Sequence, residues 1–303
     1  MPTGIPTNRT NITLPADISA EILEKTQSES AIMRLARQTD LPGRGKQISV
    51  ITSDPQAGWV AETDPKPVSN PGLGSKLMQA YQLAVIVPFS NQFRRDMAAL
   101  YDELVRRLPR ALAHQFDATV IGAVDKPGEN FDNFALCTAQ SIIPSGGHTT
   151  YLGLLEAYKD IANHGGTLDG FAMSPAGVGV LLGAVDTTGR PIFLPSANDG
   201  EISRVLGRRT IEARGMYKAG AAAVDSTPAV PAIVGVAGDW SQALWGAVSN
   251  VDISISDQAS LTINSNQINL WERNMFAVRA EIELGFRADT SCFNLLTGAA
   301  PEA

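Results

Sequence analysis

The chain has few cysteines and no long apolar run, and each shortage excludes a class of protein. Its two cysteines, Cys137 and Cys292, are too few for a disulfide framework and match no metal-ligand spacing. We therefore expect a reducing compartment. No run of about 18 apolar residues occurs, which argues against a membrane span. The N-terminus also lacks the basic and apolar regions of a signal peptide.

Catalytic motifs are also absent from the sequence. It contains no HExxH, CxxC or GxSxG motif and no phosphate-binding GxxxxGK loop. Residues 177–183 place Leu182 where a dinucleotide-binding loop requires its third glycine. The histidines His114, His148 and His164 share no motif with a nucleophile. We therefore predict no catalytic, cofactor-binding or metal-binding residues.

The charge balance is acidic, since 31 Asp and Glu against 24 Lys and Arg give a formal net charge of −7. No basic stripe of the kind that binds duplex nucleic acid occurs. An acidic wall that faces nucleic acid without binding it tightly is compatible with this charge. The hydrophobic fraction of 44% predicts a globular chain, and 303 residues suffice for a sizeable core.

Two helical segments are predicted in the first part of the chain. Residues 17–38 favour one helix or two short ones, with Asp17 as the N-cap. Residues 90–121, with Ser90 as the N-cap, predict the strongest helix, because apolar residues recur every three or four positions. Pro109 inside this helix predicts a kink one turn earlier. The same helix carries Phe93, Met97, Leu104 and Phe116.

A long connection separates these two helical segments. Residues 46–53, 57–63 and 81–89 each alternate as strands do, while residues 64–76 are rich in proline and glycine. Connections of this length are usually functional. We expect the strand runs to pair as an extended two-stranded arm. Because an isolated ribbon is marginal in water, the arm needs a surface to lie on, which is another subunit if the body is too small.

The rest of the chain predicts an α/β unit over residues 151–249 and then several strands. A helix from residue 151 ends on Gly165-Gly166, a favourable C-cap. Over residues 268–287, apolar residues share one parity and charged residues hold the other. This alternation exceeds the usual strand length, so we predict a bend or break near Arg273-Asn274.

Several loose sequence patterns follow one another in collinear order over residues 17–296. They are AGWVAETDPKP (57–67), QLAVIVPFSNQFRRD (82–96), GFAMSPAGVGVLLGAVDTTGRPIF (170–193), RVLGRRTIEA (204–213), VGVAGDWSQALWG (234–246) and WERNMFAVRAEIELGFRADTSCFNLL (271–296). In this order the chain resembles the HK97-type major capsid protein family of tailed double-stranded DNA bacteriophages.

The resemblance implies an α+β HK97 fold with five segments. They are an N-terminal arm (1–42), an extended E-loop (43–82), a P-domain with the spine helix (83–135), an A-domain (136–249), and the P-domain return strands with the C-terminus (250–303).

The resemblance also implies which residues contact neighbouring subunits. E-loop contacts would come from Trp59, Val60, Glu62, Lys66 and Lys76. The resemblance separately assigns Trp271, Arg273, Arg279 and Glu281 to the P-domain. Some members of the family link an E-loop lysine covalently to a neighbour's asparagine. We expect the lysines of this chain to be unlinked and solvated.

The leading hypothesis is therefore a non-enzymatic shell protein. Its copies would assemble as hexamers and pentamers into an icosahedral virion capsid in the host bacterial cytoplasm, enclosing DNA without sequence-specific binding. Portal and decoration proteins would be partners, and scaffolding would be either a separate protein or unnecessary, because only sixteen residues precede the first predicted helix. An encapsulin-like nanocompartment shell is the alternative, and an α/β enzyme within residues 136–249 is the third.

Overall fold

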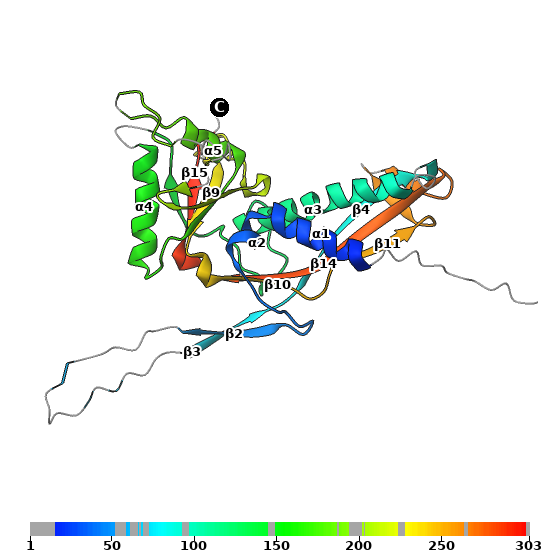
Figure 1. Cartoon of the computed structure of the whole chain (residues 1–303), viewed down its shortest axis with the longest axis horizontal. Helices are drawn as coiled ribbons and strands as arrows, with labels where there is room; N and C mark the ends of the chain where they lie inside the picture. Colours follow the sequence, from blue (N-terminus) through cyan, green and yellow to red (C-terminus); the bar gives the residue numbers. More distant parts are fainter. Residues whose placement is uncertain are drawn as a thin grey trace, which may run out of the picture.

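The computed structural model shows an elongated, two-lobed body from which one hairpin projects (Figure 1). One lobe surrounds the long strand β14, and the other surrounds β9 and β15. The residues that the structure describes are 16–51, 59–60, 66, 68, 73–92, 97–144, 149–186, 188–193, 202, 204–223, 228–263 and 266–300.

The first lobe is built on a five-stranded sheet whose longest strand, β14 (Met275–Ala288), pairs along both edges. β14 pairs antiparallel with β4 (Tyr81–Ser90) over ten residue pairs, from Met275↔Ser90 to Leu284↔Tyr81. Its other edge pairs antiparallel with β10 (Ala243–Ala247) and β11 (Asp252–Ser256). The short strand β1 (Arg37–Gln38) extends the sheet beyond β10.

The alternation predicted over residues 268–287 is confirmed in β14. The even-numbered residues of β14 from Phe276 to Phe286 are buried in the lobe's core, because successive strand side chains point to opposite faces. The predicted break is confirmed too. The chain turns between Leu270 and Asn274, where Asn274 adopts a φ of 56°, before β14 begins.

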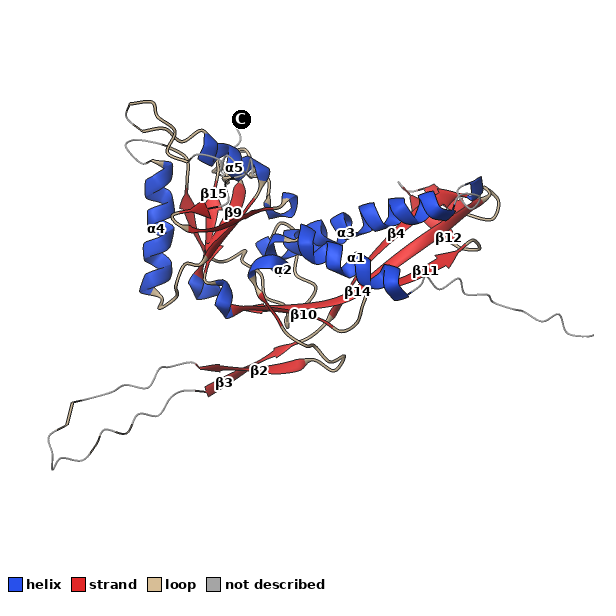
Figure 2. Ribbon diagram, in the orientation of Figure 1, coloured by secondary structure: helices blue, strands red, loops and turns tan. Residues whose placement is uncertain are grey.

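Helices α1 (Ala16–Glu29), α2 (Ala31–Leu35) and α3 (Met97–Ile121) pack together on this sheet (Figure 2). α3 contains 25 residues, so it is about 38 Å long. Its buried residues recur as the apolar spacing predicts, and Pro109 lies inside it. They include Leu104, Leu108, Leu112 and Phe116.

The predicted N-cap Asp17 is wrong, because Asp17 lies within α1, which already includes Ala16. Ser90 is the last residue of β4, paired with Met275, and its Oγ accepts a hydrogen bond from the Gln92 amide at 3.4 Å. Because residues 93–96 lie outside the described ones and α3 is described from Met97, Ser90 as the N-cap of this helix stays a prediction.

The second lobe contains a six-stranded sheet with its own core. Helices α4 (Thr150–Asn163) and α5 (Pro175–Leu182) pack on the sheet and share this second core with it. The strands, in sheet order, are β5 (Thr138–Ser141), β15 (Phe293–Thr297), β9 (Ile233–Gly238), β6 (Gly170–Met173), β8 (Arg208–Glu212) and β7 (Arg204–Val205).

Local sequence signals position the second lobe's helices. Thr149 caps α4 by accepting a hydrogen bond from the Leu152 amide, and Ser174 caps α5 in the same way. α4 ends at Asn163 with His164 as its C-cap, and the predicted Gly165 follows with a φ of 79°, which suits glycine. The amide of Gly166 then donates to the Ile161 carbonyl, which closes the last turn.

The two sheets exchange strands at places that differ from the predicted segment boundaries. β10 lies within the predicted A-domain segment (136–249) but pairs with β14. β15 lies within the predicted P-domain return (250–303) but pairs with β5 and β9. The short 3-10 helices η3 (Trp240–Gln242) and η4 (Thr290–Cys292) mark these two crossings. None of the helices in the described ranges has the length and apolar character needed to cross a membrane.

Candidate functional site

The projecting hairpin is one of two separate two-stranded sheets among the residues that the structure describes. Strand β2 (Lys46–Ile51) pairs antiparallel with β3 (Leu73–Met78), from Lys46↔Met78 to Ile51↔Leu73. Within the described residues, neither strand pairs with any other. Because a two-stranded ribbon is marginal in water, this hairpin is a candidate for contact with another surface.

The hairpin differs from the predicted arm in its strands. β2 is confirmed, but its partner β3 overlaps the end of the stretch rich in proline and glycine (64–76) and was not predicted. The third predicted run forms β4, which pairs with β14 in the body instead of joining the arm. Trp59 and Val60 are not in a strand, and the other residues of the run 57–63 lie outside the described ones.

One side chain anchors the hairpin to the body. Of the hairpin side chains that are described, only Met78 is buried, with no exposed surface. A Cβ atom at Gly246 or Gly285 would lie 3.5 or 3.2 Å from its Cε. Met78 therefore fills a socket that two neighbouring strands leave open by lacking side chains, and Leu41 closes that socket.

The predicted E-loop residues are exposed where they are described. Trp59 is fully exposed, Val60 and Lys66 are exposed, and Glu62 lies outside the described residues. Lys76 is exposed, and its Nζ donates to the Ala288 carbonyl at 3.4 Å.

The predicted helix residues are core residues where they are described. Leu104 and Phe116 are buried, and Phe116 packs edge-on against Phe131 and Phe286. Phe93 lies outside the described residues, and Met97 begins α3. Leu104 and Phe116 therefore stabilise the subunit and do not offer a surface to a partner.

The predicted P-domain residues divide into two groups. Trp271 is 72% exposed and Arg273 is also exposed, both in the turn that precedes β14. Arg279 instead lies within β14, where its Nε contacts Glu281 Oε1 at 3.0 Å and donates to Ser254 Oγ at 3.1 Å. The exposed tryptophan is therefore the stronger candidate for contact with a partner.

A carboxyl group on α3 is buried, and this was not predicted from the sequence. Asp117 is 1% exposed and accepts hydrogen bonds from Ser30 Oγ at 2.5 Å and the Ala31 amide at 3.0 Å, with the Ile32 amide at 3.4 Å. Burial raises its pKa to about 7, although these hydrogen bonds lower it. An aspartate on the buried face of a predicted helix, next to Phe116, was the available signal.

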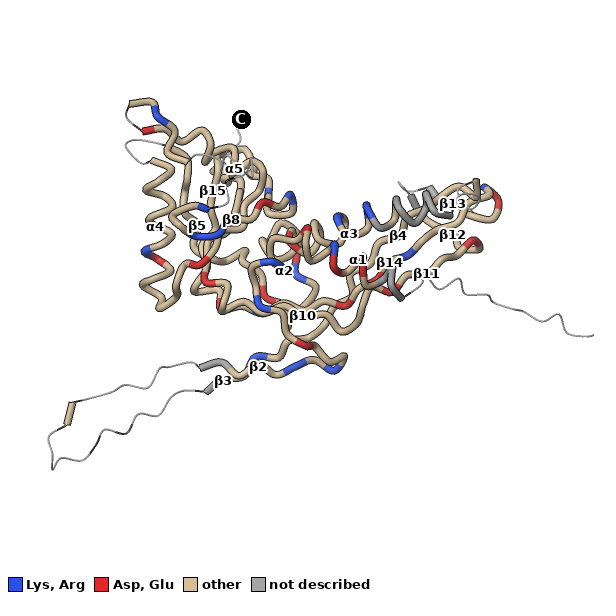
Figure 3. Tube along the Cα trace, viewed as in Figure 1, with Lys and Arg blue, Asp and Glu red and all other residues tan. Residues whose placement is uncertain are grey.

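Several charged groups face the same region from neighbouring elements. Glu29 of α1 pairs with Arg110 of α3 at 3.1 Å. His114, Glu212 and Arg214 line the adjacent groove, and Asp117 lies at its base. Acidic and basic groups alternate here, so the groove carries no strong charge of one sign. Elsewhere, too, residues of both signs are interspersed over the body (Figure 3).

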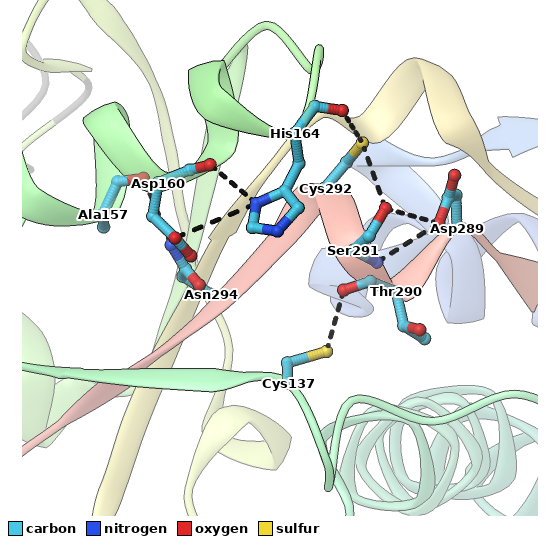
Figure 4. A network of polar contacts seen from close by, with 9 residues as sticks. All are labelled: Cys137, Ala157, Asp160, His164, Asp289, Thr290, Ser291, Cys292 and Asn294. Carbon is cyan, nitrogen blue, oxygen red and sulfur yellow. Dashed lines mark hydrogen bonds and ion pairs between the residues drawn. The ribbon is translucent and has the colours of Figure 1, made fainter.

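One cluster brings both cysteines near a histidine, and its geometry does not form a nucleophile–base pair (Figure 4). His164 Nδ1 lies 2.9 Å from the Asp160 carbonyl, and Cys292 Sγ contacts the backbone carbonyl of His164 at 4.0 Å and Ser291 Oγ at 3.8 Å. Cys137 Sγ donates to the Thr290 carbonyl at 3.3 Å. Burial raises the pKa of the Cys137 thiol to about 12 and also raises that of Cys292. Such thiols are poor nucleophiles at neutral pH.

The described residues also contain no group of three or more His, Cys, Asp or Glu that could hold a metal ion.

Comparison with known proteins gives consistent matches over nearly the whole chain. The sequence matches the model of the phage capsid family over residues 10–289. It is 26% identical to the probable major capsid protein gp17 of Mycobacterium phage L5, over 94% of this chain and 89% of that protein. It is 22% identical to the major capsid protein of Staphylococcus phage 80alpha, over 95% and 85%. A solved structure from Gordonia phage Cozz matches with a TM-score of 0.67 at 22% identity, over 90% of this chain and 87% of that one.

Proposed function

The chain belongs to the phage capsid family, and from this premise we propose that it is a major capsid protein whose copies form the shell of a tailed bacteriophage. Its α+β fold is of the HK97 type, as the resemblance implied. The protein is a structural subunit and not an enzyme. The relatives are phage proteins, and nothing favours the nanocompartment alternative.

The observation that carries this proposal is the uncovered hairpin. Its strands β2 and β3 pair only with each other among the described residues, and its one buried side chain serves as an anchor. Figure 1 shows the hairpin leaving the body instead of folding back on it. In a shell, an identical neighbour supplies the missing surface, and Trp59 at the far part of the arm is suited to bury there.

The finer assignments are part of the same proposal. The first lobe acts as the peripheral P-domain, the second as the axial A-domain, and residues 43–82 as the E-loop. Hexamers and pentamers of one chain then form an icosahedral shell, in which the same surfaces fit slightly different environments. The net charge of −7 suits a wall that encloses double-stranded DNA without binding it tightly. Portal, decoration and separate scaffolding proteins are the expected partners, and assembly takes place in the host cytoplasm.

A shortened arm tests the proposal. Because Ile51 and Leu73 face each other in the hairpin, residues 52–72 can be replaced by a two-residue Asn-Gly turn that preserves the pairing. The chain is produced with its genomic neighbours and imaged by electron microscopy, and circular dichroism verifies the fold of the variant. We expect DNA-containing shells from the natural chain and folded subunits without stable shells from the variant. Shells of undiminished stability from the variant contradict the role of the arm. Shells filled with protein cargo, or a small oligomer with turnover, contradict the proposed function.

A further inference from the structure

A polar joint holds the root of the hairpin against the body. Its centre is Arg287, near the end of β14, whose side chain is only 11% exposed. Its Nε donates to the Leu77 carbonyl of β3 at 2.8 Å. Its Nη1 and Nη2 donate to Asp132 Oδ1 at 2.7 Å and to Asn130 Oδ1 at 2.9 Å. One guanidinium group therefore joins the sheet, the hairpin and the loop that follows α3.

The acceptors in this joint are themselves held in place. The second carboxylate oxygen of Asp132 accepts from the Ala288 amide at 3.2 Å. The side-chain amide of Asn130 donates to Gln79 Oε1, and its backbone amide donates to the Tyr81 hydroxyl, both at 3.2 Å. Gln79 lies between the hairpin and β4, and Tyr81 is the first residue of β4. The joint therefore connects both the last residues of the hairpin and the segment that leads out of it.

The apolar anchor and the polar joint have different mechanical properties. Met78 is unbranched, and its flexible thioether adapts to a socket in more than one orientation. It retains the hairpin without fixing an angle. The guanidinium of Arg287 is planar, with donors in a rigid fork, so bonds to fixed acceptors define a direction.

We propose that Arg287 is a positioning residue that sets the direction in which the hairpin leaves the body. This inference rests on the proposed function, because direction matters only if the arm must reach a fixed place on a neighbour. Six paired residues span about 20 Å. A rotation of about 10° at the root therefore moves the far end of the hairpin by about 3.5 Å. That displacement is enough to break the hydrogen bonds and close packing of an interface.

The test compares two arginines of the same strand. Arg287→Gln removes the fork at the joint, and Arg287→Lys keeps the charge but loses the fork. Arg279→Gln is the matched control, because it removes an ion pair of β14 that does not touch the hairpin. Melting temperatures of all three variants establish that the subunit remains folded.

The readout is the distance between a spin label on the hairpin and one on the body. Cysteines introduced at the exposed positions Ser75 and Lys159 carry the labels, while the native thiols react slowly because burial raises their pKa values. The labelled chain is diluted in unlabelled chain, so that only distances within one subunit are measured.

We expect one narrow distance distribution for the natural chain and for Arg279→Gln, and loss of that single distribution for both Arg287 variants. We also expect particles of irregular size from the Arg287 variants, because the arms no longer share one direction. Unchanged narrow distributions for Arg287→Gln and Arg287→Lys overturn the inference. If the natural chain itself forms no shells, the proposed function fails, and the distance distributions still decide whether Arg287 orients the hairpin.

Discussion

Replacing Asp117 by asparagine is expected to remove a pH dependence of stability that originates from one buried carboxyl group. The carboxyl group is 1% exposed, and the side chain and amides at the start of α2 are its hydrogen-bond donors. Burial disfavours its ionised form more strongly than these donors favour it, so its pKa rises from 3.8 to about 7 in the folded chain. Asparagine keeps the size of the side chain and cannot ionise.

The sign of the effect follows from the two pKa values. Above a pH of about 4 the unfolded chain ionises this carboxyl group, while the folded chain keeps it protonated up to about pH 7. The unfolded state therefore binds fewer protons, and stability falls as the pH rises through this window. Each pKa unit corresponds to about 1.4 kcal/mol, so ionisation of Asp117 lowers the free energy of unfolding by about 4 kcal/mol in total. About 2.5 kcal/mol of this loss occurs between pH 5 and pH 8.

The assay is urea unfolding of the natural chain and of Asp117→Asn, each with the shortened arm so that subunits stay apart. Other groups titrate equally in both chains, so the difference between the two curves isolates Asp117. We expect the natural chain to lose about 2.5 kcal/mol relative to the variant between pH 5 and pH 8. Parallel curves refute the reasoning. A natural chain that gains stability as the pH rises shows that the donors of α2 outweigh the cost of burial.

Two further substitutions separate the stability of the subunit from the contacts between subunits. Met78→Ala leaves a cavity at the root of the hairpin and should lower the free energy of unfolding by about 2–5 kcal/mol. Urea unfolding measures this loss, and a loss below about 1 kcal/mol means that the Met78 side chain is not needed as an anchor. Trp271→Ala should change subunit stability by at most about 0.5 kcal/mol, because the side chain is 72% exposed. It should weaken assembly by about 2 kcal/mol or more in a light-scattering titration if the indole is an anchor between subunits; unchanged assembly excludes that role.

Where local pattern and tertiary packing agree, the sequence predicted the structure well. The parity of β14, its break before Met275 and the glycine end of α4 each depend on a few neighbouring residues. In β14, the side chains that the alternation assigned to one face are the ones buried in the core. The same holds for the buried stripe of α3.

The failures concern pairings between distant parts of the chain. Glycine, serine and lysine give β3 little strand propensity, and it becomes a strand because β2 pairs with it. The apolar face of β4 was correctly identified, but its alternation does not predict which strand it pairs with. β4 pairs with β14 because this pairing buries its apolar side chains in a larger core than the arm provides. β10 and β15 each follow a short 3-10 helix that carries the chain from one sheet to the other, which no local pattern indicated.

The candidate site was predicted only in outline. An extended arm that needs another surface followed from the sequence, whereas the joint at Arg287 did not. Its guanidinium binds residues more than 150 positions away in sequence, at Asp132 and Asn130. The exposed parity of β14 predicted a solvated arginine there, and only the folded loop after α3 supplies its acceptors.

The most direct test of the account is amide hydrogen exchange of residues 46–51 and 73–78, measured in dissociated subunits and in assembled shells. The central claim is that this hairpin lacks a covering surface in the single subunit and receives one from a neighbouring copy. We expect rapid exchange in the subunit and strong protection in the shell, while the amides of β14 are protected in both. Equal exchange of the hairpin amides in both states contradicts the claim.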